Sequence, residues 1–169
     1  MIGNLHIIRK WFGACRGMQD GFLKALLSDD LEGMNDYMNE VSGEMFSSFD
    51  TGKKPSEKAQ PERFYHGFVL GLLAQLQDRY VITSNRESGL GRYDIMIEPK
   101  RAGDVAFIIE FKVVHAKRQE TLEDGVKAAL QQIEEKRYEA VLLSRGIEPE
   151  KIRKYGFAFE GSRVLIGSA

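Results

Sequence analysis

The chain has 169 residues, of which 43% are hydrophobic and 29% are charged, a composition typical of an ordinary globular protein. We expect one compact domain with a sizeable core, and no repeat or low-complexity tract indicates an extended architecture. The net charge of -1 counts against a strong free-standing nucleic-acid binder, because such proteins usually carry an overall or clustered positive charge.

The single cysteine, Cys15, excludes an internal disulfide and a cysteine-based zinc cluster, and it fits a reducing compartment. The N-terminus has no secretory pattern, and no apolar run approaches the roughly 20 residues that span a bilayer. We therefore expect a cytoplasmic protein that is neither exported nor inserted in a membrane.

The first 50 residues carry apolar side chains at helical spacing, which predicts amphipathic helices that pack on the rest of the chain. Asp29 or Asp30 is positioned to cap the longer helix at its N-terminus. The alternative is that these faces bind a partner or a second copy. A stretch rich in Gly, Pro and charge follows and predicts a linker, which divides the chain into a helical segment, residues 1–55, and a main domain, residues 56–169. The apolar stripes are Leu5, Ile8, Trp11 and Phe12; Phe22, Leu23, Leu26 and Leu27; and Met34, Tyr37, Met38, Val41, Met45, Phe46 and Phe49.

The first half of the main domain is predicted to be a helix followed by three strands. Pro61 suits the first turn of the helix. The third strand is apolar on both faces at its centre, as expected for a central strand of a covered sheet. The predicted bounds are 61–77 for the helix and 80–83, 93–98 and 105–114 for the strands, with a loop at 87–91 and a turn at 99–104.

The second half is predicted to contain a helix, a short buried strand, a helical turn and a hairpin around Gly161-Ser162. This order predicts an α/β fold with a mixed central sheet flanked by helices. The predicted bounds are 120–137 for the helix, 140–143 for the strand, 149–155 for the turn, and 157–159 and 164–166 for the hairpin.

A Glu-x-Lys tripeptide occurs three times, so the tripeptide alone identifies no site. The first, Glu98-Pro99-Lys100, falls in a predicted turn, and the third, Glu134-Glu135-Lys136, lies on a helix, where residues i and i+2 do not share a face. Only Glu110-Phe111-Lys112 lies in a strand, whose period of two points the two charged side chains to one side.

Asp94 lies beside Glu110 if the strands on either side of the 99–104 turn pair antiparallel. The two carboxylates and a backbone carbonyl, that of Phe111, then supply the hard oxygen ligands that Mg²⁺ prefers, with Mn²⁺ as a substitute. Lys112 on the same face is placed to orient or help deprotonate a water and to offset charge on a phosphate. These roles fit metal-assisted phosphodiester hydrolysis.

The alternative interpretation is a structural ion cluster at a sheet end. We favour the functional interpretation because Glu110 and Lys112 interrupt the apolar run from Ile108 to Val113, which we expect to be buried. An unpaired charge costs free energy in such a place.

Residues from about 62 to 164 resemble the PD-(D/E)XK nuclease superfamily domain found C-terminal to AAA-ATPase-like domains in bacterial proteins. The segments that carry the resemblance are Phe64 to Phe68 with Leu70 to Leu73, Glu87 to Asp94, Glu110 to Val113, and Ala129 to Ile133 ahead of Tyr138.

The resemblance implies a restriction-endonuclease-like fold in which Asp94, Glu110 and Lys112 are the catalytic motif. Tyr93 stands where the superfamily name has proline, a departure that removes no ligand. The resemblance also implies that an acid of the first helix contributes, for which Glu62 is the candidate.

A glutamine of the later helix is implied as a further site residue. On a helical wheel Gln131 lies opposite the apolar stripe whereas Gln132 borders it, so we choose Gln132.

Four further residues are candidates near the site. Glu62 and His66 are four residues apart and face the sheet together, with His66 a candidate to bind substrate; an acid favoured by the helix dipole and a core histidine are the alternatives. Arg92 is placed to bind a phosphate or Glu87, and Lys117 to follow a nucleic-acid backbone, with a solvated basic face as the alternative. The basic clusters are Lys117-Arg118 and Lys151, Arg153 and Lys154.

The function expected from these residues is Mg²⁺-dependent cleavage of DNA, favoured over RNA. The alternative is a catalytically silent nuclease-like fold that serves as an interaction module, which the near-neutral charge favours. An AAA-ATPase-like domain or protein is an expected partner, and homo-oligomerisation stays open.

Overall fold

The computed structural model describes residues 16–49, 61–88, 91–115 and 118–169, with side chains described over 21–44, 65–84, 94–115 and 118–169. The predicted stripe from Leu5 to Phe12 and nearly all of the predicted linker lie outside the described residues. Among the described helices, none has the length and apolar character needed to cross a bilayer.

A five-stranded mixed sheet forms the centre of the protein, in the order β1-β2-β3-β4-β5. Neighbouring strands are antiparallel except β3 and β4, which are parallel. A parallel pair requires a crossover connection, and the segment that contains α5 provides it. The strands are β1 (Tyr80–Ser88), β2 (Gly91–Pro99), β3 (Ala106–Val113), β4 (Ile152–Glu160) and β5 (Arg163–Ser168).

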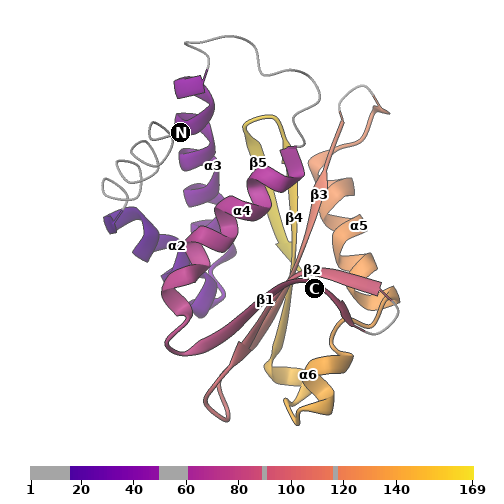
Figure 1. Ribbon diagram of the computed structural model, residues 1–169. Coiled ribbons are helices and arrows are strands. Elements are labelled where there is room, and N and C mark those ends of the chain that lie inside the picture. Colours follow the sequence, from indigo (N-terminus) through magenta and orange to yellow (C-terminus); the bar gives the residue numbers. More distant parts are fainter. Residues whose placement is uncertain (1–15, 50–60, 89–90, 116–117) are drawn as a thin grey trace, which may run out of the picture.

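Helices cover both faces of the sheet (Figure 1). On one face α3 packs against β5 and α4 against β3, while α2 packs against α3 and α4. On the other face α5 packs against β3, β4 and β5. The helices are α2 (Arg16–Ser28), α3 (Leu31–Phe49), α4 (Pro61–Leu73), α5 (Leu122–Glu135) and α6 (Ala140–Ser144), with short 3₁₀ turns η1 (Ala74–Leu76) and η3 (Pro149–Lys151).

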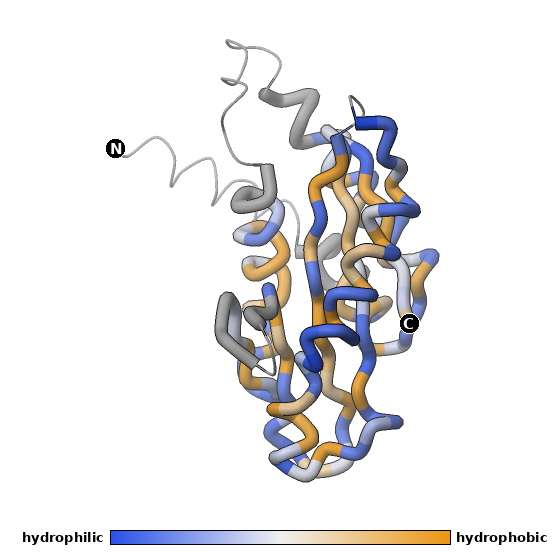
Figure 2. Tube along the Cα trace, turned by 90° about the vertical axis from the view of Figure 1, so that its right-hand side faces the viewer, coloured by the Kyte–Doolittle hydropathy of each residue, from blue (hydrophilic) through white to orange (hydrophobic). Residues whose placement is uncertain are grey.

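The central strand β3 divides the core into two layers. Phe107, Ile109 and Phe111 join a large cluster with buried residues of α2, α3 and α4, whereas Ala106 and Ile108 pack toward α5 and α6. In Figure 2 hydrophobic colour accordingly follows stretches of the strands and recurs along the helices. The prediction of an α/β fold with a covered mixed sheet is therefore confirmed, as is the helical character of the N-terminal segment over the described residues.

Asp30 caps α3, one of the two positions predicted for this role. Its Oδ1 accepts the N–H of Gly33 at 2.9 Å, which satisfies one of the free donors in the first helical turn. Phe22 of α2 packs edge-on against Phe157 of β4, with ring centroids 6.4 Å apart. The two N-terminal helices thus contribute to the same core cluster as the sheet.

The predicted strand at 140–143 is wrong, because these residues form the short helix α6. A run of four apolar residues has no period that separates a strand from a buried helical turn. Arg137, with a left-handed φ of 52°, turns the chain after α5, and Leu143 then donates its N–H to the Glu139 carbonyl at 2.9 Å. Leu142 is buried whereas Leu143 is 39% exposed, so one side of α6 faces the core.

Two other predicted segments differ from the structure, and a third agrees with it. The predicted loop at 87–91 is mostly strand, since β1 and β2 stay paired as far as Ser88↔Gly91. The predicted helical turn at 149–155 is helical only over Pro149–Lys151, because β4 begins at Ile152. The predicted hairpin around Gly161-Ser162 is confirmed, with Gly161 at a φ of 57° that suits glycine.

Candidate active site

The pairing of β2 with β3 stops before Asp94, which opens a gap between the two strands. The last backbone pair is Ile95↔Ile109. Beyond this pair the Asp94 side chain, rather than a backbone carbonyl of β2, is the acceptor for β3, since its Oδ2 accepts the N–H of Phe111 at 2.8 Å. In an extended strand the N–H and C=O of one residue point to the same side, so the Phe111 carbonyl also faces β2. The Asp94 carboxylate and this carbonyl therefore lie at the same gap.

Glu110, the residue before Phe111, is a buried carboxylate on the face of the sheet that α5 covers. The residue is only 2% exposed. Its Oε1 accepts hydrogen bonds from Lys112 and Gln132, whereas its Oε2 is buried without a hydrogen-bond partner. Burial, and after it the nearby charge of Asp94, raises the pKa of Glu110 to about 7 against the lowering effect of Lys112. The ionised form is thus costly in the absence of a further positive charge.

Glycines bring α5 close enough to the sheet to reach Glu110. Gly156 of β4 is the register partner of Glu110, and a Cβ at Gly156 would lie 2.8 Å from the Val126 carbonyl oxygen of α5. On the helix itself, a Cβ at Gly125 would lie 2.6 Å from the Val114 side chain. Helix and sheet backbones are therefore in contact at the level of the site.

The start of α5 is fixed by a capping box. The Thr121 hydroxyl accepts the N–H of Asp124 at 3.1 Å, and the Asp124 carboxylate accepts the N–H of Thr121 at 3.0 Å. These reciprocal bonds satisfy two free donors of the first turn and define the position at which the helix begins.

Gln132 of α5 connects the charged groups of the site. Its Nε2 donates to Glu110 Oε1 and, at 2.9 Å, to the Tyr138 hydroxyl. Its Oε1 accepts from Lys112 Nζ at 2.6 Å, and the same Nζ lies 3.1 Å from Glu110 Oε1. The side chains of Glu110 and Lys112, both on β3, are thus held in one orientation by the Gln132 carboxamide.

The neighbouring Gln131 takes no part in this network. It donates to Glu135 at 2.6 Å on the exposed side of the helix, so the residue chosen from the helical wheel is the one that lies at the site. Tyr138, by contrast, stands in the sequence only beside a segment that carries the resemblance, with no role predicted for it, and the structure places its hydroxyl in the network. It follows the end of α5, where helical spacing no longer gives the direction of a side chain.

His66 of α4 approaches the same gap from the opposite face of the sheet. Its Nε2 lies 3.2 Å from the Asp94 carbonyl oxygen, and its ring packs edge-on against Phe111 with centroids 5.6 Å apart. His66 therefore contacts the backbone of Asp94 and the ring of Phe111.

Three other predicted residues are not described as side chains. Glu62 lies in α4 and Arg92 in β2, but their side chains lie outside the described residues, and Lys117 lies outside them altogether.

The second basic cluster contributes to the fold. Lys154 Nζ lies 2.6 Å from Glu134 Oε1, and Arg153 donates to the Leu27 carbonyl at 3.0 Å while lying over the Phe107 ring. Two of the three Glu-x-Lys tripeptides are likewise engaged elsewhere, since Glu134 binds Lys154 and Glu98 binds Arg145.

A family model described as the PD-(D/E)XK nuclease superfamily matches residues 60–169, which include α4, all five strands and α5. The chain belongs to this superfamily. The mixed sheet with its flanking helices is accordingly a restriction-endonuclease-like fold. Neither the curated proteins nor the solved structures gave a match.

PD-(D/E)XK nucleases typically use divalent metal ions, and the donors at this site suit such an ion. Within the described ranges, no three His, Cys, Asp or Glu side chains gather into one cluster. The oxygen donors available are the carboxylates of Asp94 and Glu110 and the Phe111 carbonyl. Mg²⁺ takes oxygen ligands and retains several waters, so two carboxylates and a carbonyl suffice. The unpartnered Glu110 Oε2 is the atom that a cation would satisfy.

Proposed function

We propose that this protein is a Mg²⁺-dependent nuclease that hydrolyses phosphodiester bonds in DNA, with Mn²⁺ as a substitute ion. The observation that carries the proposal is the buried Glu110 carboxylate, whose Oε2 has no partner and whose pKa is raised by burial to about 7. A buried charge that is only partly compensated weakens folding, and such groups concentrate at functional sites.

Asp94, Glu110 and the Phe111 carbonyl are the proposed metal ligands. A bound Mg²⁺ supplies Lewis acidity to the phosphate and lowers the pKa of a bound water. The protein supplies the arrangement, since Asp94 is fixed by the Phe111 N–H at 2.8 Å and Glu110 by Gln132.

Lys112 is the proposed group that orients the attacking water and offsets the negative charge that develops on the phosphate. Its ammonium is already held by Glu110 and Gln132, at 3.1 and 2.6 Å, so it is positioned before substrate arrives. Gln132 is proposed to position both charged side chains rather than to react.

Four further residues are proposed to act around this centre. His66 supports the Asp94 backbone from the α4 side, at 3.2 Å from its carbonyl oxygen. Arg92 and Lys117 are proposed to bind substrate phosphates, and Glu62 to contribute a further acid from the first turns of α4. On the resemblance alone we also propose an AAA-ATPase-like partner, and on the single cysteine, Cys15, a cytoplasmic location.

The second candidate function is a silent nuclease-like fold that acts as an interaction module. The net charge of -1 favours it, because little electrostatic attraction draws this chain to nucleic acid.

Cleavage of plasmid, single-stranded DNA and RNA in Mg²⁺ or Mn²⁺ separates the two functions. We expect DNA cleavage by the wild type and none by Glu110→Gln or Lys112→Ala. The matched control is Glu134→Gln with Lys136→Ala, which changes the same residue types in the tripeptide at the C-terminal end of α5 and leaves the site intact. Activity that survives both site substitutions would refute the mechanism, and no activity on any substrate favours the interaction module.

A further inference from the structure

Each of the two carboxylates at the proposed metal site already has one oxygen engaged in hydrogen bonds. Asp94 Oδ2 accepts the N–H of Phe111 at 2.8 Å. Glu110 Oε1 accepts from Lys112 Nζ at 3.1 Å and from Gln132 Nε2. The oxygens outside these bonds are Asp94 Oδ1 and Glu110 Oε2, of which Oε2 is buried without a hydrogen-bond partner. Each acid therefore offers one oxygen to a cation.

A centre with two metal ions needs a carboxylate that contacts both ions. In such centres the ions lie about 3.5 to 4 Å apart. Two divalent ions at this distance repel each other strongly, so an acid between them has to bind one ion with each oxygen. Within the described ranges no third His, Cys, Asp or Glu gathers with Asp94 and Glu110. The bridge would therefore have to be one of these two.

Glu110 does not have its Oε1 available for such a bridge. An oxygen that accepts two hydrogen bonds uses both of its lone pairs, and Oε1 accepts from Lys112 and from Gln132. A Mg²⁺ ion about 2 Å from Oε1 would also lie against the Lys112 ammonium, where two positive charges repel. The ammonium thus occupies the place that a bridging ion would take.

Asp94 is kept from bridging by the backbone of β3. An ion at Oδ2 would displace the N–H of Phe111, which takes this oxygen at 2.8 Å where the β2–β3 ladder has ended. Phe111 is only 1% exposed, so its N–H would be left without a partner, which is costly.

The group that blocks Glu110 Oε1 is itself held in place. The Gln132 carboxamide accepts from Lys112 at 2.6 Å and donates to the Tyr138 hydroxyl at 2.9 Å. Its helix α5 already touches the sheet backbone, since a Cβ at Gly156 would lie 2.8 Å from the Val126 carbonyl oxygen. Gln132 therefore has fixed partners on the helix side of the site.

We propose, on the basis of the nuclease function proposed above, that the site binds a single Mg²⁺ ion and that Lys112 and Gln132 exclude a second ion from Glu110 Oε1. In a two-ion centre the second ion helps to stabilise the reacting phosphate. Here the Lys112 ammonium supplies that second positive charge. Lys112 and Gln132 thereby set the number of ions, in addition to their positions at the site.

The first test counts the ions in the wild type, by calorimetric titration of Mn²⁺ at pH 8 and by electron paramagnetic resonance. We expect one ion per chain and the spectrum of an isolated Mn²⁺ ion. Below saturation the cleavage rate is expected to rise with the first power of free Mg²⁺. Glu62→Gln is included because the side chain of Glu62 lies outside the described residues, and we expect the count to stay at one.

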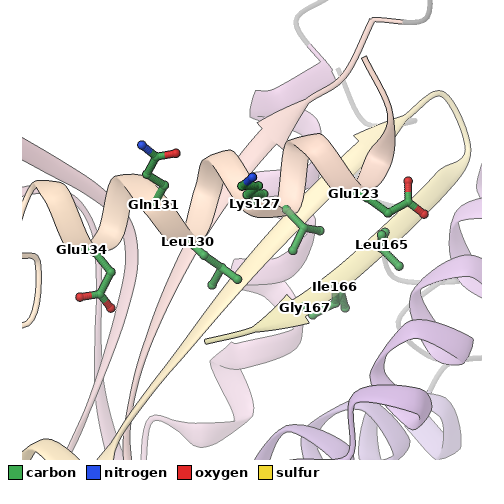
Figure 3. Close-up of a pocket in the computed structure, with 9 residues that line it drawn as sticks. Glu123, Lys127, Leu130, Gln131, Glu134, Leu165, Ile166 and Gly167 are labelled. Carbon is green, nitrogen blue, oxygen red and sulfur yellow. The ribbon is translucent and has the colours of Figure 1, made fainter. Parts of the chain in front are cut away.

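The second test frees Glu110 Oε1 with Lys112→Ala and Gln132→Ala in one chain. We expect this variant to bind a second, weaker Mn²⁺ ion and to give the spectrum of a magnetically coupled pair. The matched control is Lys127→Ala with Gln131→Ala, which changes the same residue types at exposed positions of α5. These two residues lie along an open groove of about 600 Å³ between α5 and β5 (Figure 3). The control is expected to bind one ion.

Two ions in the wild type, a coupled spectrum or a rate that rises with the second power of Mg²⁺ would overturn the inference and leave the nuclease proposal standing. A wild type that binds no Mn²⁺ refutes both together. One ion in the variant with Oε1 freed contradicts the role of Lys112 and Gln132. If that variant does not fold, the wild-type count and the power of Mg²⁺ in the rate decide the question.

Discussion

Replacement of Glu110 by glutamine is expected to stabilise the metal-free protein at high pH while it removes the proposed function. The substitution keeps the size of the side chain and removes its charge. Burial raises the pKa of Glu110 from 4.5 to about 7. Between these values the folded protein holds a proton that the unfolded chain has released, so the stability of the wild type falls as pH rises through this window.

The magnitude follows from the same two pKa values. At about 1.4 kcal/mol per pH unit, ionised Glu110 lowers the free energy of unfolding by about 3 kcal/mol above pH 8. Part of this penalty is already present at pH 5, so the advantage of Glu110→Gln over the wild type grows by about 2 to 3 kcal/mol between pH 5 and pH 8. New contacts of the glutamine amide add an offset that does not change with pH.

Urea unfolding in EDTA at pH 5 and pH 8 measures this change, with Glu135→Gln as the exposed control on α5. The control is expected to follow the wild type at both pH values. Added Mg²⁺ is expected to stabilise the wild type at pH 8 and to leave Glu110→Gln unchanged, because an ion that binds only the folded state stabilises it. Parallel stability curves for wild type and Glu110→Gln would refute the account of a buried, weakly compensated carboxylate.

Three further substitutions test how the site is built. Gly156→Ala places a Cβ 2.8 Å from the Val126 carbonyl, so we expect α5 to shift, a loss of about 1 to 3 kcal/mol in urea unfolding and a fall in kcat, and wild-type kcat would contradict this. Tyr138→Phe removes the hydroxyl that accepts from Gln132, so we expect a several-fold lower kcat with unchanged KM in cleavage kinetics, and unchanged kcat would leave Tyr138 without a positioning role. Thr121→Ala removes the capping box and is expected to lower stability by about 1 kcal/mol in thermal unfolding, with full activity below the transition; an unchanged Tm would contradict the capping role.

The placement of the central acid pair could be predicted from the sequence because it depends on local periodicity. A strand brings residues i and i+2 to one face, which selected Glu110 and Lys112 from three tripeptides. A short turn between two strands then brought Asp94 near Glu110, and the hydrogen bond from Phe111 to Asp94 agrees with this placement. For Gln132 the resemblance implied a glutamine of the later helix, and the helical period then selected Gln132 over Gln131.

Other features depend on contacts for which the sequence gives no local signal. Asn35 and Asn39 of α3 lie at a spacing that suits a solvated helix face, and their partners in the β5 backbone, Ile166 and Val164, are 131 and 125 residues away. Tyr138 lies beyond the end of α5, where the left-handed Arg137 changes the direction of the chain. Gly156 fell between the predicted helical turn and the predicted strand, so its place inside β4, where a glycine often marks close approach of another backbone, became clear only from the structure.

The short helix α6 could not be distinguished from a strand. Its four consecutive apolar residues suit a buried position in either structure, and only the hydrogen bonds that follow Arg137 decide between them.

Calorimetric titration of Mn²⁺ at pH 8 into wild type, Glu110→Gln and the Glu134→Gln, Lys136→Ala control tests the central claim most directly. The account predicts binding by the wild type and the control and no binding by Glu110→Gln, and in a second titration at pH 7 it predicts proton release on binding to the wild type. Equal binding by all three proteins would contradict it, because the buried carboxylate would then not hold the metal.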